Sequence, residues 1–164
     1  MSVYGLWNNK GGVGKSYLTF QIAAEYAVQN PDKSVVVIDL CPQANSSMML
    51  LGGVVDGYKN LEDLKLKTIS GYIQERIISP YIDPKKGYLY LTKVNDFNKK
   101  IEENLYLIAG DNSLELQADS IISATRSGPN DSWQKVHLWI ADLINSVKDN
   151  FKNQETTFFI DFNP

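Results

Sequence analysis

The sequence has one cysteine, one histidine and no long apolar segment among its 164 residues. A single cysteine cannot form an internal disulfide, which fits a reducing cytoplasm. No apolar run approaches the roughly 18 residues that a membrane-spanning helix needs, so we expect no membrane segment. The formal net charge of -3 gives no overall basic field that would attract nucleic acid. With 43% hydrophobic and 21% charged residues, residues 1–164 are expected to form one globular domain.

The most informative stretch runs from Asn8 to Ser16 and reads Asn-Asn-Lys-Gly-Gly-Val-Gly-Lys-Ser. It separates an apolar run at residues 3–7, expected to be a strand, from an apolar-periodic segment at residues 15–29, expected to be a helix. Glycines allow backbone N–H groups to surround phosphate oxygens, and a helix N-terminus adds further donors. Lys15 can then reach the phosphates, and the Ser16 hydroxyl can bind Mg²⁺. The stretch predicts a phosphate-binding loop; the alternative is a flexible glycine turn with surface lysines.

This loop differs from the usual phosphate-binding motif, because Asn9 replaces its first glycine and Lys10 precedes the double glycine. The variant resembles the deviant Walker A motif of the ParA/MinD group of P-loop ATPases. The resemblance implies an α/β fold with three α-β-α layers around a mostly parallel sheet, with ATP and Mg²⁺ as ligands. Tyr17 departs mildly from the family, which usually has a threonine there. The implied cofactor-binding residues are Lys10, Gly11, Gly12, Val13, Gly14, Lys15, Ser16 and Tyr17.

A second motif follows the β-branched run Val35–Ile38, which is typical of a strand buried on both faces of a parallel sheet. This run ends in Asp39, and the carboxyl ends of such strands border the ligand crevice of open α/β sheets. Residues 39–47 resemble the switch segment of ParA/Soj-type partition ATPases. The resemblance implies that Asp39 supports the Mg²⁺ shell through water. The alternative for Asp39 is a helix cap or a turn residue.

Cys41 departs from that segment, because the family has there a second aspartate that helps to position the attacking water. A neutral thiol is a poor hydrogen-bond acceptor, and negative phosphates would oppose its ionisation. We therefore expect nucleotide binding to survive while hydrolysis is weakened or lost. Cys41 could equally be a small residue without a catalytic role. The catalytic set that the resemblance implies is Lys10, Lys15, Asp39 and, in place of the aspartate, Cys41.

The last apolar run, residues 157–160, leads into Asp161 and fits a Walker B strand. The resemblance implies that Asp161 holds Mg²⁺ opposite Ser16, so the expected metal residues are Ser16, Asp39 and Asp161. The resemblance covers nearly the whole chain but only the front part of the family domain. We therefore expect a domain truncated after this strand, without the C-terminal strands and helices that supply adenine contacts, dimer surface and DNA-binding residues in the family.

The remaining segments give weaker expectations, and residues 52–103 are the least informative. In the helix at residues 15–29, Leu18, Ile22 and Tyr26 recur with spacing four beside small alanines, which predicts close packing on the sheet. Short helices are expected at residues 46–51 and from Ser70, and a turn capped by Asn60.

Two strands are expected, at residues 88–91 and 104–110. Asp111 or Asn112 is expected to cap a helix, and residues 127–130 to form a turn. A further helix starting at Asp131 or Ser132 should bury one apolar stripe, while His137 lies off that stripe and is expected at the surface. The stripe consists of Trp133, Val136, Ile140, Leu143, Ile144 and Val147.

The function implied by the resemblance is a cytoplasmic bacterial ATPase that forms a sandwich dimer with ATP and acts in plasmid or chromosome partitioning. Lys10 would then reach the phosphates of a partner protomer; the alternative is an exposed loop lysine. A ParB-type partner protein and nonspecific DNA, bound through the absent C-terminal part at the nucleoid, are implied partners. Three alternatives stay open: a non-hydrolysing module that dimerises on ATP, an ATP-dependent metabolic enzyme, and a MinD-like positioning ATPase, which would need a C-terminal amphipathic helix.

Overall fold

The structure is a computed structural model that describes residues 1–10, 12–82, 86–126, 131–152 and 154–162. Its centre is a five-stranded sheet in the order β1-β5-β2-β4-β3. Strands β1, β5, β2 and β4 run parallel, and only the short β3 pairs antiparallel, with β4. The strands are β1 (Ser2–Leu6), β2 (Ser34–Asp39), β3 (Thr92–Lys93), β4 (Leu105–Ile108) and β5 (Thr156–Asp161). The expected mostly parallel sheet is confirmed.

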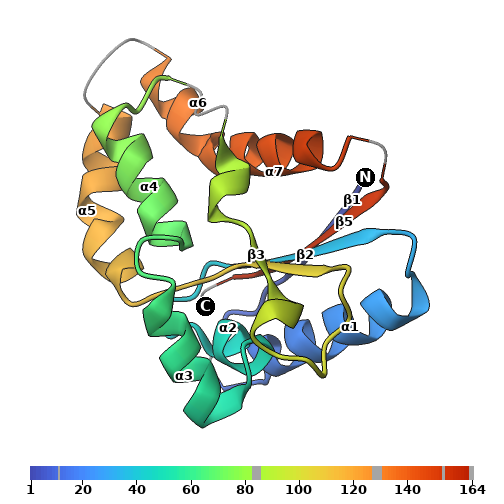
Figure 1. Ribbon diagram of the computed structural model, residues 1–164. Helices are drawn as coiled ribbons and strands as arrows, with labels where there is room; N and C mark the ends of the chain where they lie inside the picture. The colour runs from blue at the N-terminus through green and yellow to red at the C-terminus, as the bar shows by residue number, and fades with distance from the viewer. Residues whose placement is uncertain (11, 83–85, 127–130, 153, 163–164) are drawn as a thin grey trace.

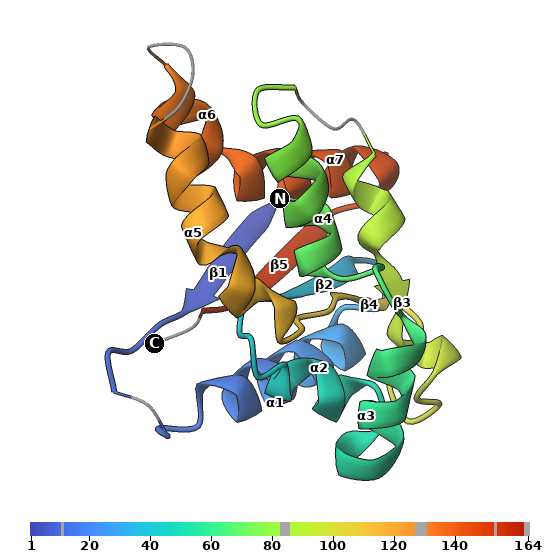
Figure 2. The ribbon, with the colours of Figure 1, turned by 90° about the vertical axis from the view of Figure 1, so that its left-hand side faces the viewer.

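Helices cover both faces of this sheet, as Figures 1 and 2 show. On one side lie α1 (Lys15–Gln29), α2 (Asn45–Leu50) and α3 (Gly53–Asp63). On the other lie α4 (Ile69–Ile78), α5 (Ser113–Arg126), α6 (Ser132–His137) and α7 (Trp139–Asn150). Two short 3₁₀ helices, η1 (Gly87–Tyr90) and η2 (Val94–Asp96), flank β3. No helix among the described residues is long and apolar enough to cross a membrane.

Each face of the sheet has its own apolar core. Ala23 and Ala27 of α1 are buried against Val35 and Val37 of β2 on the first face. Trp139, Tyr72 and Phe158 are among the largest fully or nearly fully buried side chains on the second face. Every residue of β2 is buried, as expected for a central parallel strand.

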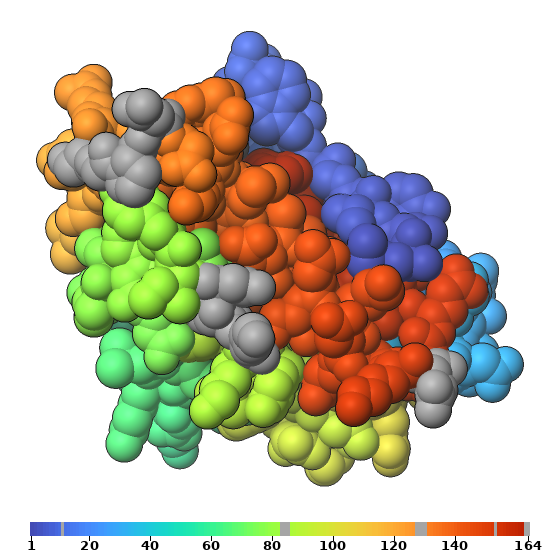
Figure 3. All heavy atoms as spheres, turned by 90° about the horizontal axis from the view of Figure 1, so that it is seen from above, coloured from blue at the N-terminus to red at the C-terminus, as the bar shows by residue number. Residues whose placement is uncertain are grey.

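The apolar stripe predicted along α1 is only partly buried. Its alanines pack on the sheet, but Leu18 and Ile22 remain 48% and 42% exposed. Tyr26, in the same row, is half-buried, and its hydroxyl accepts a hydrogen bond from Thr157 Oγ1 of β5. Beyond β1, which lies along one margin of the molecule in Figure 3, no described strand continues the sheet. The prediction is therefore right for the alanines and wrong for Leu18 and Ile22.

Two of the weaker expectations, both for residues after the switch segment at 39–47, are wrong. Residues 88–91 are not a strand, since Gly87–Tyr90 forms η1 and β3 begins only at Thr92. The Gly87 N–H donates to Ser146 Oγ of α7 at 2.8 Å, a tertiary contact that a local pattern cannot reveal. Asn60 does not cap a turn: it lies within α3 and its side chain donates to the Leu51 carbonyl.

Other expectations need smaller changes. The helix α4 exists, but Thr68 caps it by accepting from the Gly71 N–H, and Ser70 lies inside it. The predicted C-terminal helix is divided into α6 and α7 at Leu138. Most of its apolar stripe is buried, whereas Trp133 is 53% exposed. His137 is exposed, as expected. The turn expected at residues 127–130 lies outside the described residues.

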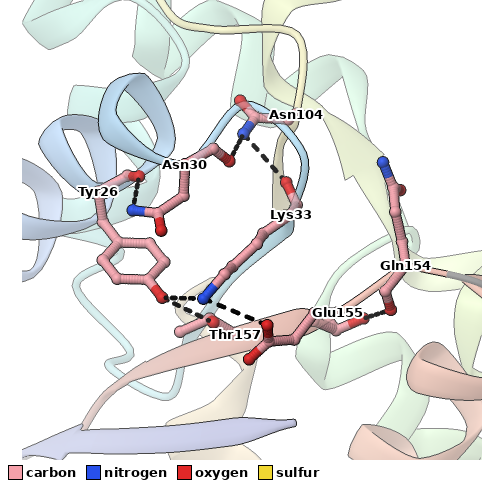
Figure 4. A network of polar contacts seen from close by, with 8 residues as sticks. Tyr26, Asn30, Lys33, Asn104, Gln154, Glu155 and Thr157 are labelled. Atoms are coloured by element: carbon pink, nitrogen blue, oxygen red, sulfur yellow. Dashed lines mark hydrogen bonds and ion pairs between the residues drawn. The ribbon is translucent and has the colours of Figure 1, made fainter.

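A polar network fixes the edge of the sheet at which β2, β4 and β5 begin (Figure 4). The Asn104 side-chain amide donates to the carbonyls of Ala27, Asn30 and Lys33 at 2.9 to 3.1 Å. These carbonyls lie at the end of α1 and in the turn that follows, where a helix leaves backbone acceptors without partners. The Asn104 amide therefore joins the start of β4 to the α1–β2 connection.

We expect Asn104→Ala to lower the free energy of unfolding by about 1–3 kcal/mol, because partly buried carbonyls lose their donor. Chemical denaturation followed by circular dichroism measures this change. Asn145→Ala, at an exposed position of α7, is the matched control and should change stability by less than about 0.5 kcal/mol. Equal stability of the two variants would show that water replaces the Asn104 amide at no cost.

Candidate functional site

Two carboxyl groups lie beside each other at the edge where the parallel strands end. Asp39 and Asp161 are the last residues of β2 and β5 and are direct partners in the register of these strands. Both side chains are completely buried. Parallel neighbours bring their carboxyl ends to the same edge, which explains why residues far apart in the sequence meet here.

Asp39 is held by a dense set of hydrogen bonds. Its Oδ1 accepts from the Cys41 N–H at 3.0 Å, and its Oδ2 accepts from the Ser47 N–H at 3.0 Å and the Ser47 hydroxyl at 2.7 Å. Ser47 Oγ in turn accepts from the Gly110 N–H at 3.0 Å, beyond the end of β4. Asp39 thus fixes the loop between β2 and α2, which is the role of the turn residue that the sequence left open.

Burial raises the pKa of the Asp39 carboxyl, and the neighbouring Asp161 charge adds to this, while hydrogen bonds from Ser47 and Cys41 oppose it. Asp161 differs from Asp39 in its contacts. Within the described part of the chain, neither Oδ1 nor Oδ2 of Asp161 has a hydrogen-bond partner. A buried carboxylate without a partner is costly, so Asp161 is the group in this cluster that most requires a ligand.

Cys41 completes the cluster. Its Sγ lies 3.8 Å from the backbone carbonyl oxygen of Asp161, to which the thiol is a weak donor. Burial, followed by the charges of Asp39 and Asp161, raises the pKa of the Cys41 thiol to about 12. Cys41 is therefore a neutral thiol at physiological pH, as the sequence led us to expect.

The glycine loop leads into α1 at the same edge of the sheet. Gly12 and Gly14 have φ angles of +73° and +84°, in the left-handed region that glycine adopts without strain. Gly14 is the N-cap of α1 and offers no side-chain cap, so the first N–H groups of a 15-residue helix are available to an anion. Lys10 is exposed, and Gly11 lies outside the described residues.

A cleft of about 680 Å³ lies between this loop and the segment that follows β2. Most of the expected cofactor-binding residues line it, namely Gly12, Val13, Gly14, Lys15, Ser16 and Tyr17, together with Cys41. Lys10, Asp39 and Asp161 do not line it; Lys10 is exposed and both aspartates are buried. A second hollow, of about 540 Å³, runs along α7 and contains none of the expected site residues.

The residues present suit a magnesium ion. Mg²⁺ prefers oxygen ligands and usually retains several waters. The Ser16 hydroxyl belongs to a residue that lines the cleft, and the Asp161 oxygens lack partners in the described residues. Asp39 keeps only part of its acceptor capacity, since three hydrogen bonds already reach it.

Several residues of the cleft were not among those expected. Gln43 and Asn45 belong to the switch motif and could have been included on that ground, whereas Met48 and Met49 of α2 carry no comparable signal. Gly53 and Val54 of α3 also line the cleft, although they lie in the region that the sequence left uninformative. Val54 is apolar and 89% exposed, and a valine carries no chemistry that would mark it as part of a site.

Comparison with known proteins identifies the family of the chain. A family model described as an AAA domain, AAA_31, matches residues 1–153. The chain belongs to this family, which is the ParA/MinD-like group of P-loop proteins. None of the curated proteins compared with the sequence matches it significantly.

Solved structures share the fold at low sequence identity. Protein DIP2308 from Corynebacterium diphtheriae has a TM-score of 0.68 and 20% identity, over 98% of this chain and 53% of its own. Cobyrinic acid a,c-diamide synthase from Mycobacterium smegmatis, solved with an ATP analogue and magnesium, has a TM-score of 0.52 and 17% identity, over 97% of this chain and 50% of its own. A plasmid partition protein from Borrelia burgdorferi has a TM-score of 0.50 and 15% identity, over 98% of this chain and 55% of its own. The chain thus spans about half the length of these proteins.

We expect Ser47→Ala to destabilise the protein by about 1–3 kcal/mol, because the Gly110 N–H loses its acceptor and Asp39 loses a donor. Thermal or chemical unfolding measures the change. Ser123→Ala, at an exposed position of α5, is the control and should lie within about 0.5 kcal/mol of the parent. A Ser47→Ala protein as stable as this control would contradict the bridging role of Ser47.

Proposed function

We propose that this chain binds ATP with Mg²⁺ in the cleft between the glycine loop and the β2–α2 segment. The observation that carries the proposal is the convergence of the α1 N-terminus, with Gly12 and Gly14 at positive φ, and the buried Asp161 at one edge of the sheet. A phosphate needs backbone donors, and its metal ion needs carboxylates. Gly12, Gly14 and Ser16 line a cleft of about 680 Å³, and the buried Asp161 lies at the same edge of the sheet, beside Cys41 of the cleft.

The loop residues bind the phosphates in this proposal. The N–H groups of residues 11–16 surround the phosphate oxygens, and the Lys15 ammonium adds positive charge. Lys15 forms no ion pair with any described residue, so its charge is free to act on an anion. Ser16, Asp39 and Asp161 hold Mg²⁺, with Asp39 acting through water. When bound, Mg²⁺ neutralises charge on the phosphates.

Hydrolysis is slow in this proposal because Cys41 is a poor orienter of water. Its thiol is neutral and has the Asp161 carbonyl as its nearby acceptor. An aspartate at this position would accept a hydrogen bond from the attacking water, and a thiol accepts weakly. The same observation favours a second candidate, a module that binds ATP and dimerises without turnover.

The wider role that we propose is that of a partition ATPase. ATP joins two copies in a sandwich dimer, in which the exposed Lys10 reaches the partner's phosphates. A ParB-type protein and nonspecific DNA, contacted by a C-terminal part, are the proposed partners in a bacterial cytoplasm. Membership of the ParA/MinD-like family and the similarity to a plasmid partition protein support this role. Similarity to a synthase keeps a metabolic ATP-dependent enzyme as an alternative.

Nucleotide binding is tested by titrating a fluorescent ATP analogue with and without Mg²⁺. We expect Mg²⁺-dependent binding that Lys15→Ala weakens about tenfold or more, because a charge-assisted contact with phosphate is lost. Lys100→Ala, at an exposed site away from the cleft, is the matched control and should bind as the parent does. Equal binding by the two variants would remove Lys15 from the site.

Turnover is tested by single-turnover phosphate release from Mg-ATP by the parent and by Cys41→Asp. We expect release to be at least about tenfold faster for Cys41→Asp, since positioned acid–base groups contribute on the order of 10²–10⁴. Equal rates would mean that position 41 is not catalytic. No release from either protein, with ATP bound to both, would instead favour the module that does not hydrolyse ATP.

A further inference from the structure

We propose that Cys41, Asp161 and Asp39 form a binding site for a thiophilic divalent cation, with Zn²⁺ as the ion that fits this set of ligands. One ligand atom from each residue, the Cys41 sulfur and a carboxylate oxygen of each aspartate, can be chosen so that all three lie within 4.8 Å of one another. All three residues are buried. Asp39 and Asp161 come from adjacent strands, and Cys41 follows Asp39 by two positions.

The carboxylate of Asp161 indicates independently that a cation belongs here. Both of its oxygens are buried and have no hydrogen-bond partner among the described residues. The Cys41 thiol donates its weak hydrogen bond to the backbone oxygen of Asp161 and not to the Asp161 carboxylate. Buried charged groups in proteins are typically paired or coordinate a metal. A cation between Cys41 and Asp161 would supply that missing partner.

The sulfur of Cys41 decides which cation is preferred. Magnesium and calcium take oxygen ligands, whereas a thiolate selects zinc and other soft or borderline ions. Among the described residues, the Cys41 sulfur makes one weak hydrogen bond, at 3.8 Å, and this is the contact that a metal would displace. On binding, the S–H bond breaks, its proton passes to solvent, and a metal–sulfur bond forms without any change of oxidation state.

Asp39 supplies the third ligand, and hydrogen bonds to its carboxylate hold that ligand in place. Its carboxylate has room for about four hydrogen-bonding or metal contacts, and three are used by Cys41 and Ser47. These bonds fix the carboxylate in place, as surrounding donors do in known metal sites. Three protein ligands leave a fourth position of a zinc site open. The ion can enter through the cleft, because Cys41 lines it.

The proposed Mg²⁺ ion uses the same two carboxylates, so Zn²⁺ and Mg²⁺ would be alternative occupants. Zn²⁺ held through Cys41 would then oppose Mg-ATP turnover, giving control of the site by a soft cation. This consequence rests on the proposed function, whereas Zn²⁺ binding by the free chain does not.

The test uses the untagged, metal-free chain without nucleotide, titrated with Co²⁺ and then with Zn²⁺. We expect one equivalent of Co²⁺ to produce the charge-transfer absorption of a cobalt–thiolate bond, and Zn²⁺ but not excess Mg²⁺ to abolish it. Cys41→Ser should lose this absorption, and Asp161→Asn should weaken Co²⁺ binding at least about tenfold. His137→Gln, which changes the single histidine, is the control and should bind as the parent does.

A second measurement does not depend on the variants folding. Cys41 is the only thiol, and Zn²⁺ should slow its alkylation in the parent protein while Mg²⁺ should not. The absence of a cobalt–thiolate band, or unchanged alkylation in saturating Zn²⁺, would overturn the proposal. Loss of binding in His137→Gln alone would assign the ion to that histidine and would also overturn it. None of these results bears on Mg-ATP binding, which is tested separately by the nucleotide titration of the parent and of Lys15→Ala.

Discussion

Two buried carboxyl groups held side by side form the constraint on which the rest of this site depends. Asp39 and Asp161 meet because β2 and β5 are parallel neighbours that end at the same edge. Burial raises the pKa of the Asp39 carboxyl, and the nearby Asp161 charge adds to this. The two carboxyl groups differ in their contacts, since Asp39 accepts three hydrogen bonds and Asp161 accepts none from the described residues. Asp39 therefore holds the loop that follows β2, whereas the Asp161 side chain keeps both of its acceptor oxygens unused among the described residues.

The sequence predicted best where the chemistry is local. The glycines and the β-branched run from Val35 indicate the bounds of α1 and β2, because backbone conformation and two-sided burial leave direct signatures. Helix α3 gave no such signal. Its only buried residue is Gly57, and an added Cβ there would lie 2.0 Å from the Met48 carbonyl oxygen. Helix α3 thus packs closely on α2 at Gly57, while Val54, Val55 and Tyr58 remain exposed and only Leu61 of its apolar residues packs against the core.

The site shows the same division between local and distant causes. The lining of the cleft by residues 12–17 follows from the motif itself, whereas the contact between Ser47 and Gly110 joins segments 63 residues apart. Leu18 and Ile22 of α1 are 48% and 42% exposed, although they belong to the apolar row that the spacing predicts. Periodicity alone correctly identifies a row of apolar residues, but it cannot state what lies opposite that row.

Position 41 links the two chemical properties proposed for this cleft. A carboxylate there would add a third negative oxygen donor, which suits Mg²⁺ and can accept a hydrogen bond from water. The thiol is instead neutral, with its pKa raised to about 12 by burial and by Asp39 and Asp161, and it offers sulfur to a metal. The neutral thiol adds no further negative charge beside the two buried carboxyl groups. Under the two proposals made above, a thiol at position 41 in place of a carboxylate both removes an acceptor for water and favours a thiophilic metal in this cluster.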